Sequence, residues 1–465
     1  MPFFTTHSPS LPHRFVASVV CGLLLGVLPS LVRPNTALAW EPETTHAGLA
    51  ETSAMDSKIH EQLNILFGEK AGLYAELGVP RKDAPEIFMI LDKHSPSEGY
   101  TPDTRGIQTA LSWLVAGAVL ADTPKEFAKK HFFPASFLKK KVRSSTQNAL
   151  AWLTDPKNPM GVNQFYDQFK KAVISSSRLE RQRHLAGALL AAGAIHHVVT
   201  DMASPSHVRA DLDSHNETID PKTGERGSRF ERLASLAFGR LGILRSKTKA
   251  PPLKTLKSIF VGKNSLVERV ASTYFSKGTL PKDFKAKSNA NLNTLELKMS
   301  KAQTFATPKI QMVDLWAAKK ENGTAFRNTQ NVCLTKYRFE KSVVTFFIDD
   351  NCALEQISEL LPLAAAYGSS LLNYLFRGSL ALENGSVSYD GPSVKNGKLT
   401  YLWDDVTGKR VAIGAPISWD GRGQLESPMP PKQANSLVVF FEGVDSMGES
   451  FITAGQKDIS SSPLN

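Results

Sequence analysis

The sequence predicts a mainly α-helical protein that ends in a small β-rich domain. Up to about residue 380, apolar residues recur at helical spacing in long segments rich in Ala and Leu. After residue 381, the short runs SVSYDG, GKLTYLW, RVAIGAPISW and SLVVFFEG are separated by Gly, Asp, Asn and Pro, which is typical of strands joined by turns. With 465 residues, 42% of them hydrophobic, the chain can fill both parts: an all-helical body at 40–380 and a sandwich-like domain at 381–465.

Residues 1–39 have the composition of a signal peptide. Arg14 precedes the apolar run FVASVVCGLLLGVLPSLV, and the segment ends in Ala37, Leu38 and Ala39, a small-x-small pattern that signal peptidase cleaves. We expect cleavage before Trp40 and a secreted or periplasmic protein. An uncleaved membrane anchor is the alternative, because a run of this length can just span a bilayer.

The helical body divides into several expected helices. The segment GIQTALSWLVAGAVLAD predicts a mostly buried helix, and the small residues of ERQRHLAGALLAAGAIHHVVTD let neighbouring helices approach it closely. The Lys-rich segment 246–304 is expected at the surface as loops and short helices. The expected helices cover about 46–76, 106–122, 160–176, 180–201, 228–244 and 354–380.

Charge and cysteine content narrow the function classes. A formal net charge of +11 suits contact with phosphate-bearing substrates, acidic lipid surfaces or nucleic acid, although it is equally compatible with simple solubility. Cys21 lies in the leader, so Cys333 and Cys352 remain, and an exported protein can join such a pair in a disulfide. They are too few for a thiolate zinc site, and the chain has no GxSxG or P-loop motif.

The stretch HHVVTDMASPSH, residues 196–207, holds three of the eleven histidines. His197 and Asp201 are four residues apart, so on a helix they share one face and can hold one metal ion. Pro205 then breaks the helix and leaves His207 free to turn toward the same region. Imidazole and carboxylate without thiolate suit zinc in a hydrolase. The alternative is a structural His–Asp hydrogen bond, with His207 in a surface loop and His196 as a packing residue.

Other residues of the same types could join this site if the fold brings them together. His46 lies in TTHA, Asp122 ends an apolar helix, and His131 lies in KKHFFP. His215 lies in DLDSHNE and Glu231 in GSRFE.

Taken together, these motifs resemble the zinc-dependent phospholipase C family, which includes bacterial phosphatidylcholine-preferring enzymes and clostridial alpha-toxin. The family motif His-x3-Asp-x5-His, with a Pro two residues before the last His, matches His197, Asp201, Pro205 and His207. The mature family proteins begin with a Trp, which Trp40 matches, and a Thr-His-Ala context is matched around His46.

The resemblance implies a helical catalytic domain, of the kind shared with P1-type nucleases, that holds three zinc ions. Gly227 stands where the family has a further His, so either His215 replaces it or only two ions bind. The implied ligand sets are Asp122, His131, His197 and Asp201 for one ion, Trp40, His46 and Asp201 for the second, and His207, Glu231 and His215 for the third.

The implied activity is phospholipase C, in which a metal-activated water attacks the phosphodiester of glycerophospholipids such as phosphatidylcholine. Asp122 would act as a ligand alone or also as the base, and Phe132 and Phe133 would line the substrate cleft or belong to the core. The implied partner is a phospholipid surface, with no protein partner. A zinc phosphodiesterase or single-strand nuclease is the first alternative, although its last motif typically ends in Asp rather than Glu. A module that binds metal or membrane without catalysis is the second.

Overall fold

A computed structural model describes residues 37–38, 42–67, 71–93, 106–124, 126–135, 148–219, 226–241, 251–285 and 323–459. The predicted leader up to residue 36 and Trp40 lie outside these ranges. Strand β1 (Ala37–Leu38) pairs in parallel with β5 (Arg226–Gly227), a contact that cleavage before Trp40 would remove. Among the described helices, none has the length and apolarity needed to cross a bilayer.

Helix α8 (Arg178–Asp201) forms the centre of the helical body, with α5 (Ala110–Leu120) and α7 (Val162–Ile174) packed against it. Helix α5 is buried over nearly its whole length, as its apolar sequence predicts. The two helices α5 and α8 touch backbone to backbone: a Cβ on Gly117 would collide with the Leu190 carbonyl, and one on Gly193 with the Leu114 carbonyl. This close approach brings the C-terminal ends of both helices to one place.

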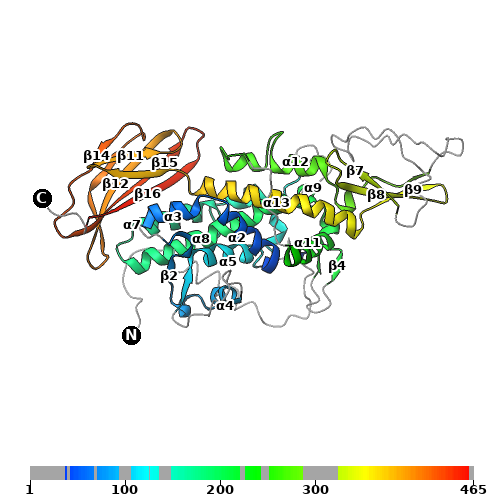
Figure 1. The fold of residues 1–465 in the computed structure, drawn as a ribbon, viewed down its shortest axis with the longest axis horizontal. Helices are drawn as coiled ribbons and strands as arrows, with labels where there is room; N and C mark the ends of the chain where they lie inside the picture. The colour runs from blue at the N-terminus through cyan, green and yellow to red at the C-terminus, as the bar shows by residue number, and fades with distance from the viewer. Residues whose placement is uncertain are drawn as a thin grey trace.

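Helix α13 (Asp350–Leu375) runs along the body between two β regions at opposite ends of the molecule (Figure 1). Asp349 caps it by accepting a hydrogen bond of 2.9 Å from the Cys352 N–H. The helix also packs on α2 (Ala47–Met55), where the Ser53 hydroxyl donates to the Ala365 carbonyl. Helix α13 packs on α8 as well. Because α2 directly follows His46, α13 therefore helps to fix His46 relative to α8.

The C-terminal region contains two antiparallel sheets that share one core. Val387 in the first sheet and Tyr401 and Phe441 in the second are buried in the same apolar cluster, so the region is a two-layer sandwich. The first sheet has the order β10 (Ser379–Glu383), β11 (Ser386–Asp390), β14 (Leu425–Glu426), and the second has β13 (Arg410–Ser418), β12 (Val394–Asp405), β15 (Ala434–Asp445), β16 (Ser450–Asp458).

A buried arginine joins the sandwich to the helical body. The Arg410 guanidinium makes two hydrogen bonds of 2.7 Å to the Asp404 carboxylate and donates to the Val173 carbonyl in α7. Its backbone N–H donates to the Ser176 carbonyl. Since both charges are buried and paired, this contact fixes the orientation of the sandwich.

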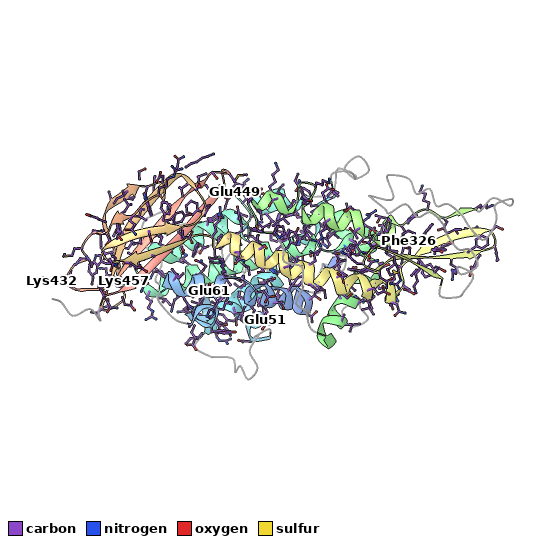
Figure 2. The ribbon with its side chains drawn as sticks, turned by 45° about the horizontal axis from the view of Figure 1, so that its top comes forward. Glu51, Glu61, Phe326, Lys432, Glu449 and Lys457 are labelled. Atoms are coloured by element: carbon purple, nitrogen blue, oxygen red, sulfur yellow. A yellow bond between two sulfur atoms is a disulfide. The ribbon has the colours of Figure 1, made fainter. Side chains whose placement is uncertain are left out.

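The body is not all-helical, which corrects the prediction for 40–380. Four strands form a sheet in the order β6 (Phe284–Lys285), β9 (Val343–Phe347), β8 (Cys333–Glu340), β7 (Thr324–Arg327). The alternating apolar and polar residues of β8 and β9 are a strand signal that the helical expectation overlooked. Figure 2 shows Phe326, a buried residue, where this sheet meets the helices.

A disulfide ties the four-stranded sheet to α13. Cys333 at the start of β8 is bonded to Cys352 in the first turn of α13, and their Cα atoms are 5.1 Å apart. Cys333 also donates its N–H to the Glu355 carboxylate at 3.0 Å. The first turn of α13 is therefore held from the side of the sheet.

Two further sequence expectations need correction. The described part of the Lys-rich segment is not purely a surface feature, because Leu256, Phe260 and most apolar residues of α12 (Leu266–Thr273) are buried in the main core. The remainder, 246–250 and 286–304, lies outside the described residues. The helix expected at 46–76 is divided: α2 is followed by α3 (Ile59–Phe67), a 3-10 turn and the strand β2 (Glu76–Gly78).

Candidate metal centre

The candidate ligands come from separate segments that the helical body brings together. His197 and Asp201 lie one turn apart at the C-terminal end of α8, and Asp122 lies just after α5 ends. His46 ends a short π-helix (Pro42–His46), and His131 follows the 3-10 turn Ala128–Lys130. His207, His215 and Glu231 lie on α9 (Pro205–Arg209), α10 (Leu212–His215) and α11 (Arg229–Leu241).

Two groups of donor atoms meet around His197. One contains His46, His197 and Asp201, and the other contains Asp122, His131 and His197. Asp201 faces both groups, since its Oδ1 lies 3.2 Å from His46 Nε2 and its Oδ2 lies 3.3 Å from His131 Nδ1. His197 Nε2 is 3.4 Å from both Asp122 Oδ1 and Asp201 Oδ2.

A third group lies beside them and contains His207, His215 and Glu231. His215 Nδ1 is 3.3 Å from Glu231 Oε2, and His207 Nε2 is 3.6 Å from Glu231 Oε1. Of the two possibilities that Gly227 left open, the structure favours the one in which His215 completes this group. A Cβ on Gly227 would have only ordinary contacts, at 3.7 Å from Arg232 Nε, so the glycine is not required by close packing.

These separations agree with the geometry of a zinc site. Ligand atoms at about 2.0–2.2 Å from a tetrahedral zinc lie roughly 3.3–3.6 Å from one another. The contacts of His197 with both aspartates, at 3.4 Å, and those of Glu231 with its two histidines, at 3.3 and 3.6 Å, fall in this range. Charge-assisted hydrogen bonds are shorter, about 2.7–2.9 Å, so most of these pairs are spaced for a cation between them rather than for direct bonding.

The burial of the candidate ligands also indicates a cation site. The ligand candidates in the described residues are at most 3% exposed, and the facing atoms His197 Nε2, both Asp201 oxygens and both Asp122 oxygens have no hydrogen-bond partner. Buried carboxylates are costly unless they are paired or bind a metal. Asp201 ends α8 and Asp122 follows the end of α5, where the helix dipole also disfavours negative charge. The donor set therefore fits a divalent cation.

Hydrogen bonds behind the imidazoles orient their free nitrogens. His197 Nδ1 donates to the Ala118 carbonyl at 2.7 Å, and His207 Nδ1 donates to the His131 carbonyl at 2.9 Å. Thr200 gives its proton to the His197 carbonyl, so its oxygen accepts from His46 Nδ1 at 3.2 Å. In the neutral form of all three rings, Nε2 is then the unprotonated nitrogen and faces the centre, which is the tautomer a metal requires.

Electrostatics in the ion-free protein show how strongly the centre attracts positive charge. Burial opposes protonation of His197, but the carboxylates of Asp122 and Asp201 outweigh it and raise the pKa of His197 to about 10. The pKa of His207 rises to about 9 because Asp201 and Glu231 likewise overcome burial. Burial also opposes ionisation of Asp201, yet the neighbouring histidines hold its pKa well below the usual value.

His46 behaves differently, since burial lowers its pKa to about 4 and keeps the ring neutral. A neutral imidazole with a bare Nε2 is already in the form that binds a metal. His197 and His207 are protonated in the ion-free protein, so each must lose a proton before it can bind a metal ion.

Phe132 and Phe133 are buried, as expected from the alternative in which they belong to the core. Phe132 stacks on His207 with 4.5 Å between ring centroids and meets the His215 ring nearly at right angles, at 5.2 Å. Phe133 packs on Phe260 in the main core. Phe132 thus supports the third group of candidate ligands, and Phe133 stabilises the fold.

Further residues, some of them not indicated by the sequence, complete the surroundings of the centre. His196 is a packing residue whose Nε2 lies 2.8 Å from Ser53 Oγ. No sequence motif indicated Thr200, Trp152 or Ser204. The Trp152 ring lies 4.9 Å from that of His131, and Ser204 donates to Glu231 Oε1 at 3.0 Å. Trp40, the remaining predicted ligand, lies outside the described residues.

Comparison with known proteins gives a distant structural likeness. No protein-family model matches the chain, and no curated protein matches it. The chain is similar to the alpha-toxin of Clostridium perfringens avian strain SWCP, at 12% sequence identity over 90% of this chain and 98% of the toxin, with a TM-score of 0.28. So low a TM-score indicates a distant relationship at most.

Proposed function

We propose that this protein is an exported zinc-dependent hydrolase of phosphodiesters, acting as a phospholipase C on glycerophospholipids such as phosphatidylcholine. The observation that carries the proposal is the gathering of three buried donor groups at zinc spacing, two of which share His197. In a buried hydrogen-bond network the facing nitrogen and oxygen atoms would be paired with one another, whereas several of these atoms have no hydrogen-bond partner.

The proposed ligand sets follow the facing atoms. Asp122, His131, His197 and Asp201 would hold one ion, and His207, His215 and Glu231 another. His46 and Asp201 would hold the remaining ion together with the amino group and carbonyl of Trp40. This set requires export and cleavage after Ala39. Zinc is the favoured metal because nitrogen and oxygen donors without thiolate suit a hydrolytic zinc site.

The chain itself supplies position and charge. Zinc, when bound, supplies Lewis acidity toward phosphoryl oxygens and lowers the pKa of a bound water toward about 7. Asp201 faces both donor groups and would keep two ions adjacent. Asp122 directs Oδ1 at His131 and His197, at 3.0 and 3.4 Å, so its first role is that of a ligand.

The substrate class is proposed from the motif resemblance. Glu231 occupies a position where the related nucleases typically have Asp, which favours a lipid phosphodiester over nucleic acid. The net charge of +11 suits the anionic phosphate of either substrate.

The test uses the purified mature protein, its zinc content, and parallel assays on phosphatidylcholine vesicles and single-stranded DNA. We expect release of phosphocholine, its loss with a chelator, and recovery with zinc. His197→Ala should abolish hydrolysis. His184→Ala is the matched control, because His184 is buried on the same helix but contacts Gln168 at 2.8 Å, away from the centre.

Other outcomes would identify the alternatives. Cleavage of DNA alone would assign a nuclease. A zinc-loaded protein that cleaves neither substrate would leave a binding module and contradict the proposed activity.

A further inference from the structure

A pocket of about 510 Å³ lies beside the His207–His215–Glu231 group. Its wall contains Ser206, Ser214 and Phe230, and each of these residues directly precedes one of the three candidate ligands. Adjacent helical residues point about 100° apart, so the same short segments present ligands on one side and the pocket wall on another. The pocket and this part of the centre therefore share one framework.

Buried hydroxyl groups line the pocket. Ser206, Ser214, Ser228 and Ser276 are each at most 7% exposed, and Phe230 and Phe275 are part of the same wall. Each serine hydroxyl has one donor and two acceptor sites. A mixed wall of this kind suits a small molecule with several hydroxyl groups on an apolar frame.

The hydrogen bonds already present fix how two of these serines meet a ligand. Ser204 gives its proton to Glu231 Oε1, so it must accept from Ser206 at 3.0 Å, and the Ser206 oxygen then remains as an acceptor. The Ser228 oxygen accepts the Glu231 N–H at 3.3 Å, which leaves its own proton to donate. The ligand must therefore both donate and accept, as an alcohol does.

Each charged residue of the wall is paired with an opposite charge, which for Asp349 comes from Lys336 outside the wall. Every acidic or basic group among the lining residues has an opposite partner within 2.8 Å, so a ligand with net charge would find no unpaired counter-charge. The pairs are Arg229 with Asp350 at 2.7 Å, Lys277 with Glu217 at 2.6 Å, and Asp349 with Lys336 at 2.5 Å. An uncharged ligand is favoured over phosphate or a quaternary amine.

We propose that this pocket binds an uncharged, polyhydroxylated small molecule, and that its occupancy is coupled to metal binding by His207, His215 and Glu231. The path of coupling is the pair of hydrogen bonds from Ser206 through Ser204 to Glu231 Oε1. The coupling rests on the metal role given to these residues under the proposed function, whereas the pocket site does not.

The test is isothermal titration of the full mature, zinc-loaded protein with myo-inositol, D-glucose and glycerol, with inorganic phosphate and choline as charged comparators. We expect saturable binding of at least one of the three polyols and none of the comparators. Asn351→Trp, at an exposed pocket residue on α13, should weaken that binding about tenfold or more, a loss of at least about 1.4 kcal/mol. Leu354→Trp is the matched control, because Leu354 is exposed on the same helix but outside the wall.

Absence of polyol binding, binding of phosphate or choline instead, or equal loss in both variants would overturn the site. For the coupling, zinc affinity of the third group should rise with bound polyol by the factor by which zinc raises polyol affinity. Polyol binding with unchanged zinc affinity would overturn the coupling alone. Because hydrolysis of phosphatidylcholine is measured separately, loss of the proposed function is distinguishable from loss of this site.

Discussion

Replacing Thr200 by valine removes the hydroxyl group that sets the tautomer of His46 by accepting a hydrogen bond from its Nδ1. Thr200 is fully buried, donates to the His197 carbonyl at 2.9 Å and accepts from His46 Nδ1 at 3.2 Å. Valine has nearly the same volume, so the packing is kept while the acceptor is lost. His46 can then place its proton on either nitrogen, and its Nδ1–H loses its partner.

The expected cost follows from the loss of this supporting contact. Losing a partner of a metal-binding histidine typically lowers metal affinity about 10–100-fold, which corresponds to roughly 1.4–2.7 kcal/mol. Only the ion between His46 and Asp201 should be affected. The His207–His215–Glu231 group is oriented by the His131 carbonyl and Ser204 instead, so its affinity should stay unchanged.

Zinc titration against a chromophoric chelator measures both affinities. Thr200→Ser is the matched variant, since it restores the hydroxyl without the methyl group and should bind zinc like the unmodified protein. Equal zinc affinity in Thr200→Val and the unmodified protein, or a uniform loss over all sites, would refute the assignment of Thr200 as the residue that orients His46.

Three further outcomes are expected. Asp122→Asn should lower the zinc content by one ion, because Asp122 is a proposed ligand. Metal analysis and the activity assay are done on the same variant. A full zinc content with lost hydrolysis would assign Asp122 as the base instead. Because the pKa values of His197 and His207 are raised to about 10 and 9 without metal, both are protonated at pH 7, and zinc must displace these protons. Calorimetry in buffers of different ionisation enthalpy should show release of about two protons per protein, with zinc affinity rising between about pH 6 and pH 9; affinity independent of pH in that window would contradict these pKa values. Cys352→Ser opens the loop closed with Cys333 and should lower the free energy of unfolding by about 3 kcal/mol, measured by denaturant titration, and an unchanged midpoint would show that the bond constrains little.

The sequence allowed prediction of the candidate ligand side chains that carry a spacing or a motif. His197 and Asp201 follow from helical periodicity alone, and the helix indeed brings their ligand atoms to 3.4 Å. His215 could be named only as one of two possibilities, because its position depends on the turn between α9 and α10. There Ala210 adopts a left-handed conformation, with φ of 51°, that nothing in its own chemistry indicates.

Residues that act through tertiary contacts could not be predicted. Thr200 meets His46 across 154 residues of sequence, and Ser204 meets Glu231 across 27. Serine and threonine are common at helix ends, so their presence indicates no particular partner. The four-stranded sheet is a different case, since the alternation in CLTKYRFE and VVTFF was available in the sequence and was outweighed by the helical pattern around it.

The placement of the acidic residues connects the candidate metal centre to the stability of the fold. Asp122 and Asp201 lie at the C-terminal ends of α5 and α8, in the interior, where burial and both helix dipoles oppose a negative charge. The close approach at Gly117 and Gly193 forces these two helix ends together. The repulsion between the two carboxylates therefore cannot be relieved by separating the helices. Protonated His197 offsets part of it in the ion-free protein, and a divalent cation would offset more at the same position. Ion binding would then contribute directly to the free energy of folding, since an unfolded chain holds no such pair of carboxylates.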